Sequence, residues 1–551
     1  MRLARHVLVL GSLAAAAAAG AQGADEPYVE KVEVRVRTVL VFITDARGRP
    51  LTTRPAPTDL RVTENGKPAE VLAIERARPT AVPAAPAPGA TVAPAPSSTA
   101  SAPTLAVVPQ YLYLDTTTLR LQSVPRIVKT LGNHLDAVLA NGPLEVVVAD
   151  PEPRVTLPST RDAAAVRATL EKLPTTAVGK QRVYDARRDS LNQMLETLND
   201  PRRGGSAFRV DSRGAIRQEM ALVQASLDRL DSWAATLPYD RASVVYLCSD
   251  GFDGDLTEVY RKILRDSTRF EDHRTADQLQ LDFGRSAANV TAQAADVLAG
   301  RGATAVVLAF SGNDADFALS AANIGKYGSR TIRQPLVAAP TSYFLRPFEP
   351  LLAIADRTGG QVVSAESKMS EALDAVGRAY LVSFRSHSPA DGEPHPLEIA
   401  SASGDLRVRA PRSVLAATPR TASAGQAVRA LTIPPPAAGS LPVTATVTPL
   451  EKLEKGRTKG ALAVSADLVS IADALGRTGP GRVRITVAVE NPNGPPFTQS
   501  EETELDHSGG GTIWYYESAI VWPSNATRVA VTVEELKTGT AGSAVAELPK
   551  P

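Results

Sequence analysis

The chain has 551 residues, of which 43% are hydrophobic and 22% charged, so it can form several globular domains with buried cores. Its 60 basic and 59 acidic residues give a formal net charge of +1, which excludes both a strongly basic chain and an acidic disordered one. Aromatic residues are only 5%, so no platform for stacking bases or sugars is indicated. We therefore expect a globular protein with no nucleic-acid partner.

Residues 1–21 have the pattern of an export signal. Arg2 and Arg5 form a short basic region, residues 7–19 are apolar, and residues 19–21 are small enough for signal-peptidase cleavage. The apolar run is short for a bilayer span, which favours cleavage over an uncleaved membrane anchor. No later stretch is long and apolar enough to cross a membrane. We expect an exported protein, periplasmic, secreted or at the cell surface, with no integral membrane segment after signal removal.

A β-rich segment is predicted over residues 22–78. Apolar and charged residues alternate over residues 32–37, the pattern of a half-buried strand. Asn65 and Gly66 lie between two strand-like runs and predict a hairpin. Residues 79–104 are rich in proline and alanine and can bury too little apolar surface to offset the entropy of ordering, so we expect a linker there.

Strands and helices are expected to alternate over residues 105–385. The expected strands cover residues 111–114, 144–149, 244–247, 304–310, 361–363 and 379–384. The expected helices cover residues 124–139, 161–173, 183–198, 214–237, 275–298, 348–357 and 371–378. This alternation predicts an α/β domain with a Rossmann-like, doubly wound, mostly parallel sheet.

The rest of the chain is predicted to be β-rich. Closing strands are expected over residues 386–415, a linker over residues 416–438, and a C-terminal antiparallel β-sandwich over residues 439–551. The single cysteine, Cys248, cannot form an internal disulfide. Its place in an apolar strand favours a small core residue over the alternative, a reactive thiol.

Two acidic residues follow central strands of the predicted sheet. Asp115 ends the strand at 111–114, and Asp250 follows the strand at 243–247. Ligands of doubly wound sheets gather at this carboxyl edge. Thr116, Thr117 and Thr118 add hydroxyl groups, and oxygen ligands of this kind suit a hard cation such as Mg²⁺. The alternative is that both carboxylates cap turns and helix starts.

These residues resemble the metal-ion-dependent adhesion site of von Willebrand factor type A (VWFA) domains. There, one strand ends in Asp-x-Ser-x-Ser and a later strand in (Thr/Ser)-Asp-Gly. Asp115, Thr117 and Asp250 match that pattern. Over roughly residues 30–412 the chain also resembles VWFA-related secreted proteins of bacteria, notably acidobacteria. The elements that carry this resemblance are residues 44–50, residues 64–68, Thr358-Gly359-Gly360, residues 380–384, residues 391–392, residues 395–399 and residues 406–409.

The site departs from the family pattern at two positions. Leu119 stands at the second serine, and Gln181 stands at the distal threonine, while the nearby Thr175 and Thr176 have no assigned position. The resemblance therefore implies a degenerate site of Asp115, Thr117 and Asp250, for which Mg²⁺ is the candidate ion. Two missing oxygen ligands argue against assuming that binding depends on metal.

The expected function is an exported, non-catalytic, protein-binding or adhesion module with a VWFA-like domain. The first alternative is a structural cell-envelope or secretion-associated protein without a metal site. The second is a hydrolase, although the sequence contains no H-E-x-x-H, G-x-S-x-G or phosphate-binding loop. His387 and His395 lie in a Pro/Ser-rich segment and are expected at the surface. The identity of the protein partner and the oligomeric state are not indicated.

Overall fold

The structure is a computed structural model. It describes residues 35–77, 108–199, 205–238, 241–265, 270–284, 286–310, 344, 346–389, 391–415, 419–432, 441–454, 456–469, 481–491, 496–505, 513–536 and 540–549. The predicted signal at 1–21 and linker at 79–104 lie outside the described residues. The chain divides into the units Met1–Arg35 and Val36–Pro551, and the architecture below is that of the second unit.

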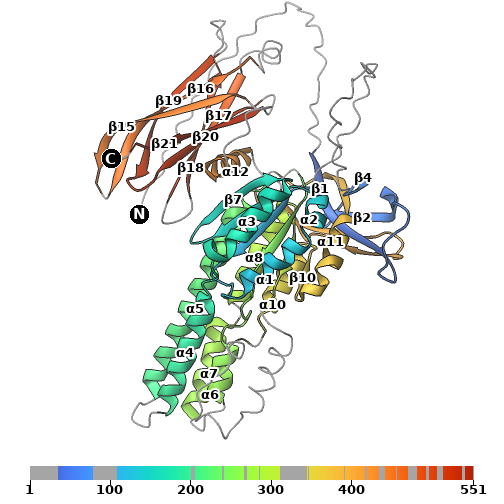
Figure 1. Ribbon diagram of the computed structural model, residues 1–551, viewed down its shortest axis with the longest axis vertical. Coiled ribbons are helices and arrows are strands. Elements are labelled where there is room, and N and C mark those ends of the chain that lie inside the picture. Colours follow the sequence, from blue (N-terminus) through green and yellow to red (C-terminus); the bar gives the residue numbers. More distant parts are fainter. Residues whose placement is uncertain are drawn as a thin grey trace, which may run out of the picture. The chain divides into compact units, whose positions relative to one another are not determined.

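A six-stranded sheet of order β10-β9-β8-β5-β6-β7 is the centre of this unit (Figure 1). Five strands are parallel, and β7 joins the edge antiparallel to β6. Counted along the chain, the order is 3-2-1-4-5-6, that of a doubly wound sheet. The predicted α/β class and mostly parallel sheet are confirmed. The six strands are β5 (Gln110–Asp115), β6 (Leu144–Ala149), β7 (Pro153–Thr160), β8 (Ser243–Cys248), β9 (Ala303–Leu308) and β10 (Gln361–Val363).

Helices cover both faces of this sheet, because side chains of successive strand residues point to opposite sides. Leu112 and Leu114 of β5 belong to one apolar core, while Tyr111 and Tyr113 belong to the other. The first face is covered by α1 (Ser123–Asn133), α2 (Leu135–Asn141), α3 (Ala163–Thr176) and α11 (Met369–Gly377). The second is covered by α5 (Gly205–Ala234), α8 (Ser286–Gly300) and α10 (Glu349–Arg357).

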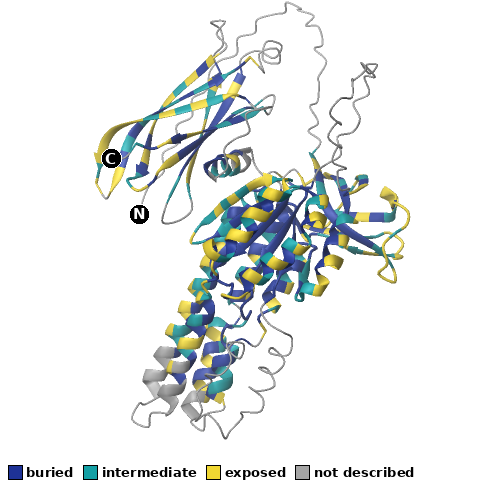
Figure 2. Cartoon of the chain, in the orientation of Figure 1, coloured by how far each residue is buried: buried dark blue, intermediate teal, exposed yellow. Residues whose placement is uncertain are grey.

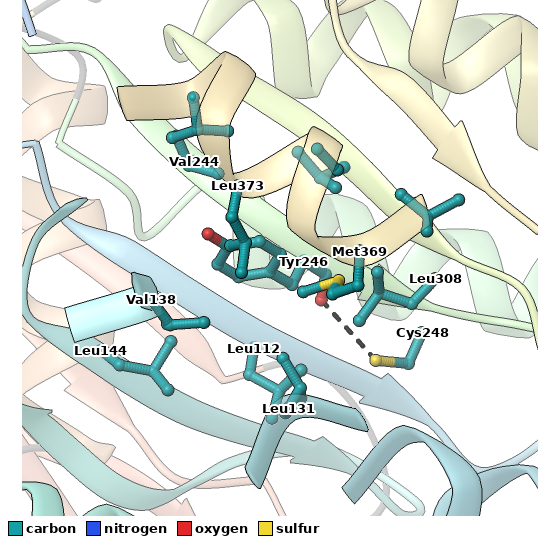
Figure 3. Close-up of a cluster of buried hydrophobic side chains, with 14 of the residues drawn as sticks. Leu112, Leu131, Val138, Leu144, Val244, Tyr246, Cys248, Leu308, Met369 and Leu373 are labelled. Carbon is teal, nitrogen blue, oxygen red and sulfur yellow. Dashed lines mark hydrogen bonds between the residues drawn. The ribbon is translucent and has the colours of Figure 1, made fainter. Parts of the chain in front are cut away.

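Cys248 lies inside the first core, beside Leu308 and Met369 (Figure 3). Its thiol is fully buried and donates a weak hydrogen bond to the carbonyl oxygen of Tyr246 at 3.8 Å. Burial in apolar surroundings raises the pKa of this thiol, which keeps it protonated. The prediction of a core residue is confirmed.

Four helices form an arm beyond the carboxyl edge of the sheet (Figure 1). This helical arm consists of α4 (Arg182–Asn199), most of α5, α6 (Glu258–Arg265) and α7 (Phe270–Phe283), and it has its own apolar core. The prediction of a single helix over residues 275–298 is wrong, because the helix is interrupted near Gly284 and forms two helices, α7 and α8 (Ser286–Gly300).

The N-terminal β segment and the closing strands form one small sandwich with a shared core. Its sheets have the orders β13-β1-β11-β4 and β14-β12-β2-β3. Positive φ angles at Asn65 (52°) and Gly66 (72°) make the β2–β3 turn, so the predicted hairpin is confirmed. The strands are β1 (Arg35–Asp45), β2 (Leu60–Glu64), β3 (Lys67–Ala69), β4 (Val71–Arg76), β11 (Tyr380–Ser386), β12 (Pro394–Ser401), β13 (Leu406–Arg409) and β14 (Ser413–Leu415).

Strand β11 does not join the parallel sheet, so the expected domain end at residue 385 is wrong. It pairs antiparallel with β4, and Tyr380, Val382 and Phe384 bury one face in the core of the small sandwich. Leu381, on the other face, packs against the α/β core. The rest of that face is less buried, since Ser383 is half-buried and Arg385 is exposed. The apolar run Tyr380-Leu381-Val382 at the start of the strand is compatible with a parallel sheet as well, so the sequence pattern alone does not decide between the two sheets.

The C-terminal region is a sandwich of two antiparallel sheets, β15-β16-β19 and β18-β17-β20-β21, around one core. The expected linker at 416–438 is wrong in part, because α12 (Pro419–Thr432) forms there and packs Ala427, Ala430 and Leu431 on the second sheet. Alanine-rich segments favour helix. The strands are β15 (Val443–Leu453), β16 (Arg457–Asp467), β17 (Gly481–Val489), β18 (Phe497–Leu505), β19 (Ile513–Pro523), β20 (Arg528–Glu535) and β21 (Ala541–Glu547).

Burial is continuous through the sheet and its covering helices, while the outer faces of the helices are exposed (Figure 2). Within the described parts of the chain, no helix has both the length and the apolar character that crossing a membrane requires.

The Thr-Gly-Gly element fixes the end of α10 against the sheet. The Thr358 hydroxyl accepts a hydrogen bond from the Ala305 amide at 3.1 Å and donates to the Ile354 carbonyl at 2.8 Å. A Cβ on Gly360 would lie 1.8 Å from the carbonyl oxygen of Ala305, so only glycine allows this approach.

We expect Gly360→Ala to lower the free energy of unfolding by about 3 kcal/mol, because the added methyl would force the backbone of β9 aside. Urea denaturation of the two proteins measures the difference. Gly404→Ala is the matched control: Gly404 has φ +84°, and a methyl group added there would meet nothing within 4 Å, so it tests backbone strain alone, worth about 1 kcal/mol. Equal losses in the two variants would contradict the close-approach explanation.

Candidate functional site

Asp115 and Asp250 lie at the carboxyl edge of the sheet, where the strand order reverses. Asp115 ends β5 and Asp250 comes two residues after β8. The two strands are parallel neighbours, with Leu114 opposite Cys248. The topology thus places both carboxylates at the position where doubly wound sheets bind ligands.

Asp115 is 5% exposed and accepts hydrogen bonds on both oxygens. Its Oδ1 accepts from the Thr117 amide at 3.0 Å, and its Oδ2 accepts from the Thr118 hydroxyl at 3.1 Å. The Ser226 hydroxyl of α5 also donates to Oδ2. The loop after β5 and the long helix α5 are therefore joined through one carboxylate.

A guanidinium group lies against the first half of the predicted site. Nη2 of Arg229, on α5, donates to the Thr117 hydroxyl oxygen at 2.7 Å and lies 3.5 Å from Asp115 Oδ1. The Arg229 side chain is only 14% exposed. Asp115 and Thr117 lie together, and both contact a cation that belongs to the chain itself.

Asp250 makes a separate set of contacts. It is fully buried, and its Oδ2 accepts hydrogen bonds from the Arg120 amide at 2.7 Å and from the Ser123 hydroxyl at 2.6 Å. The Arg120 side chain lies 3.6 Å from the same oxygen and 5.1 Å above the ring of Tyr184. Burial raises the pKa of Asp250, and Arg120 opposes that rise. Asp250 thus holds the start of α1.

The predicted metal ligands do not fit a cation in this arrangement. Mg²⁺ requires near-octahedral oxygen coordination at about 2.0–2.1 Å. The oxygens of Asp115 and Thr117 accept hydrogen bonds from Arg229, whose positive charge would repel a second cation. Among the described residues, no group of three His, Cys, Asp or Glu side chains is placed to hold a metal.

The two departures from the family pattern have structural roles. Leu119 is fully buried in the first core. Gln181 has φ +41°, its amide donates to the Leu119 carbonyl at 3.0 Å, and its side chain turns to Asp185 at 3.3 Å. Thr175 and Thr176 donate their hydroxyls to the carbonyl of Lys172 in α3. None of these side chains adds an oxygen to the site.

Of the hydroxyl groups at the carboxyl edge, the sequence indicated that of Thr118 but not those of Ser226 and Ser249. Thr118 Oγ1 lies 2.9 Å from Ser249 Oγ, and the Gly251 amide donates to that serine at 3.1 Å. Ser226 arrives from α5, 111 residues from Asp115, with no local signal in the sequence. Ser249 could have been found, since it adjoins Asp250.

Asp253, three residues after Asp250, is buried at the base of the helical arm. It is 2% exposed and accepts from the Arg346 amide at 2.7 Å and from Arg187 at 3.3 Å. Arg187 and Glu219 are both fully buried and bonded at 2.6 Å, and Glu219 also accepts from the Tyr260 hydroxyl. This cluster ties α4, α5 and α6 together at the base of the helical arm.

The prediction that His395 lies at the surface is also partly wrong. Its exposure is 9%, and its two ring nitrogens lie 2.9 Å from Asn65 Nδ2 and 2.9 Å from Asp391 Oδ1. The imidazole links the β2–β3 turn to the loop before β12. No nucleophile lies among these partners, so the contacts are those of a structural bridge.

A shallow acidic hollow adjoins Arg229 on the surface of α5. Its lining includes Glu152, Asp228 and Asp231. Burial, with a smaller contribution from Asp228, raises the pKa of Asp231 to about 7. Burial also raises the pKa of Glu152. Asp231 therefore changes charge close to neutral pH.

We expect Asp250→Ala to cost about 3–5 kcal/mol of stability, because it leaves the Arg120 charge buried without its partner. Asp250→Asn should cost less, since the amide oxygen still accepts from the Arg120 amide and Ser123. Urea denaturation gives both values. Asp162→Ala, which removes the N-cap of α3, is the control and should cost only about 1 kcal/mol. A loss no greater than the control's would contradict this role.

We expect Asp231→Asn to stabilise the protein at pH 8. The folded state holds the Asp231 proton more tightly than the unfolded chain, so wild-type stability falls as pH rises between 3.8 and about 7. The amide removes that loss, a gain on the order of 1 kcal/mol after screening by solvent. Thermal unfolding at pH 5 and pH 8 measures it. Asp136→Asn, on the exposed side of α2, controls for loss of one charge; an equal gain there would contradict the assignment.

Comparison with protein-family models gives no match, and comparison with curated proteins gives none. Among solved structures, the pilus adhesin SpaC from Lactobacillus rhamnosus GG is similar at 8% identity and a TM-score of 0.25, over 81% of this chain and 57% of that one. The alkylpurine DNA glycosylase AlkC from Pseudomonas fluorescens, bound to DNA with an abasic-site analog, is similar at 10% identity and a TM-score of 0.11, over 70% of this chain and 88% of that one. This chain thus spans little more than half of the adhesin. Such low TM-scores assign neither fold nor function.

Proposed function

We propose that this chain is an exported, non-catalytic protein-binding module built on a VWFA-like domain, in which Arg229 takes the place of the adhesion-site cation. Export rests on the signal pattern of residues 1–21. The absence of a catalytic role is part of the proposal.

Sequence and topology support the VWFA-like assignment independently. The motif residues Asp115, Thr117 and Asp250 follow two neighbouring parallel strands. The third strand of the sheet, β7, is an antiparallel edge, and the order is 3-2-1-4-5-6. The Thr358-Gly359-Gly360 element of the resemblance has a packing role that requires its residue types.

The observation that carries the proposal is the contact of Arg229 with both Asp115 and Thr117. A guanidinium group supplies positive charge and directed donors to a carboxylate and a hydroxyl, and needs no dehydration of a metal ion. The carboxyl edge is therefore charge-balanced and closed by α5. Because Asp115, Thr117 and Asp250 are at most 6% exposed, a protein partner would contact other surfaces.

We expect the thermal midpoint of the wild-type protein to be the same in millimolar Mg²⁺, Mn²⁺ or EDTA, as measured by calorimetry. Arg229→Ala should lower the free energy of unfolding by about 2 kcal/mol, because Asp115 loses a charged hydrogen-bond donor. Arg217→Ala, at an exposed position of the same helix, is the control. A rise in the wild-type midpoint with Mg²⁺ would contradict replacement of the cation.

Partner binding is tested in the cells that make the protein. Cross-linking on intact cells should give a discrete adduct with one partner protein, equally strong with and without EDTA. A structural envelope protein that assembles only with its own copies would instead cross-link to itself. Loss of the adduct in EDTA would show that partner binding depends on a metal ion.

A further inference from the structure

A groove of about 920 Å³ lies away from the carboxyl edge, between the sheet β13-β1-β11-β4 and helix α11. The sheet and the helix share the first apolar core, through Phe42 and Met369, so the two walls belong to one packed body. This volume is in the range of binding sites for ligands and short peptide segments. We call it the arginine groove, since Arg76, Arg378, Arg407 and Arg409 line it.

The sheet wall of the groove is basic. Arg407 and Arg409 are two residues apart on β13, so they point to the same face, beside Thr44 and Phe42 of β1. The Arg409 guanidinium lies 4.5 Å above the ring of Phe42. Stacking of this kind orients the planar group. Its Nη2 also donates to Gln361 Oε1 at 3.5 Å, which leaves the remaining guanidinium donors for a ligand.

Arg76 lines the groove from β4, the strand at the opposite edge of the same sheet, where it is paired with Tyr380. It lies 5.7 Å above the ring of Tyr380, and its Nη2 donates to the Leu51 carbonyl at 3.0 Å. Among the described residues, no carboxylate lies within ion-pair distance of Arg76, Arg407 or Arg409. Three oriented and exposed guanidinium groups without an acidic partner in this part of the chain favour an anionic ligand.

The helix wall has a different character. Ser370, Glu371 and Asp374 of α11 line it, and Arg378 is paired with Asp374 at 3.5 Å. The carboxylates on this side would repel a uniformly anionic polymer such as a nucleic acid, or an anionic lipid surface. The groove therefore fits a ligand that is acidic on one side and neutral or hydroxylic on the other.

An extended peptide has that arrangement, because its side chains alternate between two sides. Residues two apart on a strand are separated by about 6.8 Å, which is the spacing of Arg407 and Arg409 and equally of alternate carboxylates in an extended ligand. Each guanidinium can bind one carboxylate through two parallel hydrogen bonds. Strand β13 is also the outermost strand of its sheet, where an extended segment can lie alongside.

We propose that the arginine groove binds an extended acidic segment of the partner protein, with two carboxylates two residues apart facing Arg407 and Arg409. This rests on the proposed function in one respect, that the partner is a protein. The recognition is electrostatic, so it weakens as salt concentration rises.

The test is fluorescence anisotropy of the full chain with three labelled peptides. The first alternates glutamate with threonine, the second has glutamine in place of glutamate, and the third places its glutamates in adjacent pairs. We expect the first to bind at least tenfold more tightly than the others. Arg407→Gln and Arg409→Gln should each weaken it about tenfold. Arg61→Gln, an exposed arginine on β2, is the matched control and should bind like wild type.

Arg407→Gln tests binding without disturbing the stacking of Arg409 on Phe42, and its thermal midpoint should equal that of the control. Equal binding of the three peptides, or wild-type affinity in both folded variants, overturns the proposal. So does tighter binding of polyphosphate or of phosphatidylglycerol vesicles with the same dependence on Arg407 and Arg409. A cross-linked partner adduct that persists in these variants overturns the groove alone and leaves the proposed function standing.

Discussion

Two carboxylates at the carboxyl edge of a parallel sheet create a local excess of negative charge, and two arginine side chains of the same chain neutralise it. Asp115 meets Arg229, and Asp250 meets Arg120. Each pair also fixes an element: Arg229 and Ser226 bring α5 onto the loop after β5, while Asp250 holds the start of α1. Helix α5 continues into the helical arm, where the buried Arg187–Glu219 pair is a second ion pair inside the protein. The Arg229 and Ser226 contacts thus fix α5, the helix that covers one face of the sheet and also belongs to the helical arm.

Much of the α/β domain could be predicted, because its signals are local. Alternating apolar strands and amphipathic helices identify β5, β6, β8 and β9, and the Asn65-Gly66 pair identifies a hairpin through backbone conformation alone. The elements that failed depend on distant partners. Strand β11 begins with the apolar run Tyr380-Leu381-Val382, which is compatible with either sheet, and β7 alternates only between half-buried and exposed residues and contains two prolines.

The same division holds at the site. The sequence motif located Asp115, Thr117 and Asp250, and the topology brings the strands that carry them side by side. It could not locate Arg229, which lies 114 residues from Asp115 in a long helix with other arginines. Leu119 and Gln181 showed that two ligand positions of the family pattern lack the expected hydroxyl group. The sequence does not show which side chain contacts the site instead. A degenerate motif predicts that the metal site is altered, while only the packing of the folded chain shows that Arg229 contacts Asp115 and Thr117.

Because the carboxylates at the carboxyl edge are buried and paired, a protein partner would have to bind at another surface. Carboxylates that are buried and paired give a partner nothing to bind, whereas exposed arginines without acidic partners keep the free energy of an ion pair available for a ligand. In the described part of the chain the two conditions occur at different places: Arg229 and Arg120 are used inside the domain, and Arg76, Arg407 and Arg409 face a groove built from the N-terminal and closing strands. Those strands come from opposite ends of the α/β domain in sequence and pair in one sheet. The arginine groove therefore needs the N-terminal strands, the closing strands and α11 together, and the partner site that we propose is formed by the segments that enclose the domain.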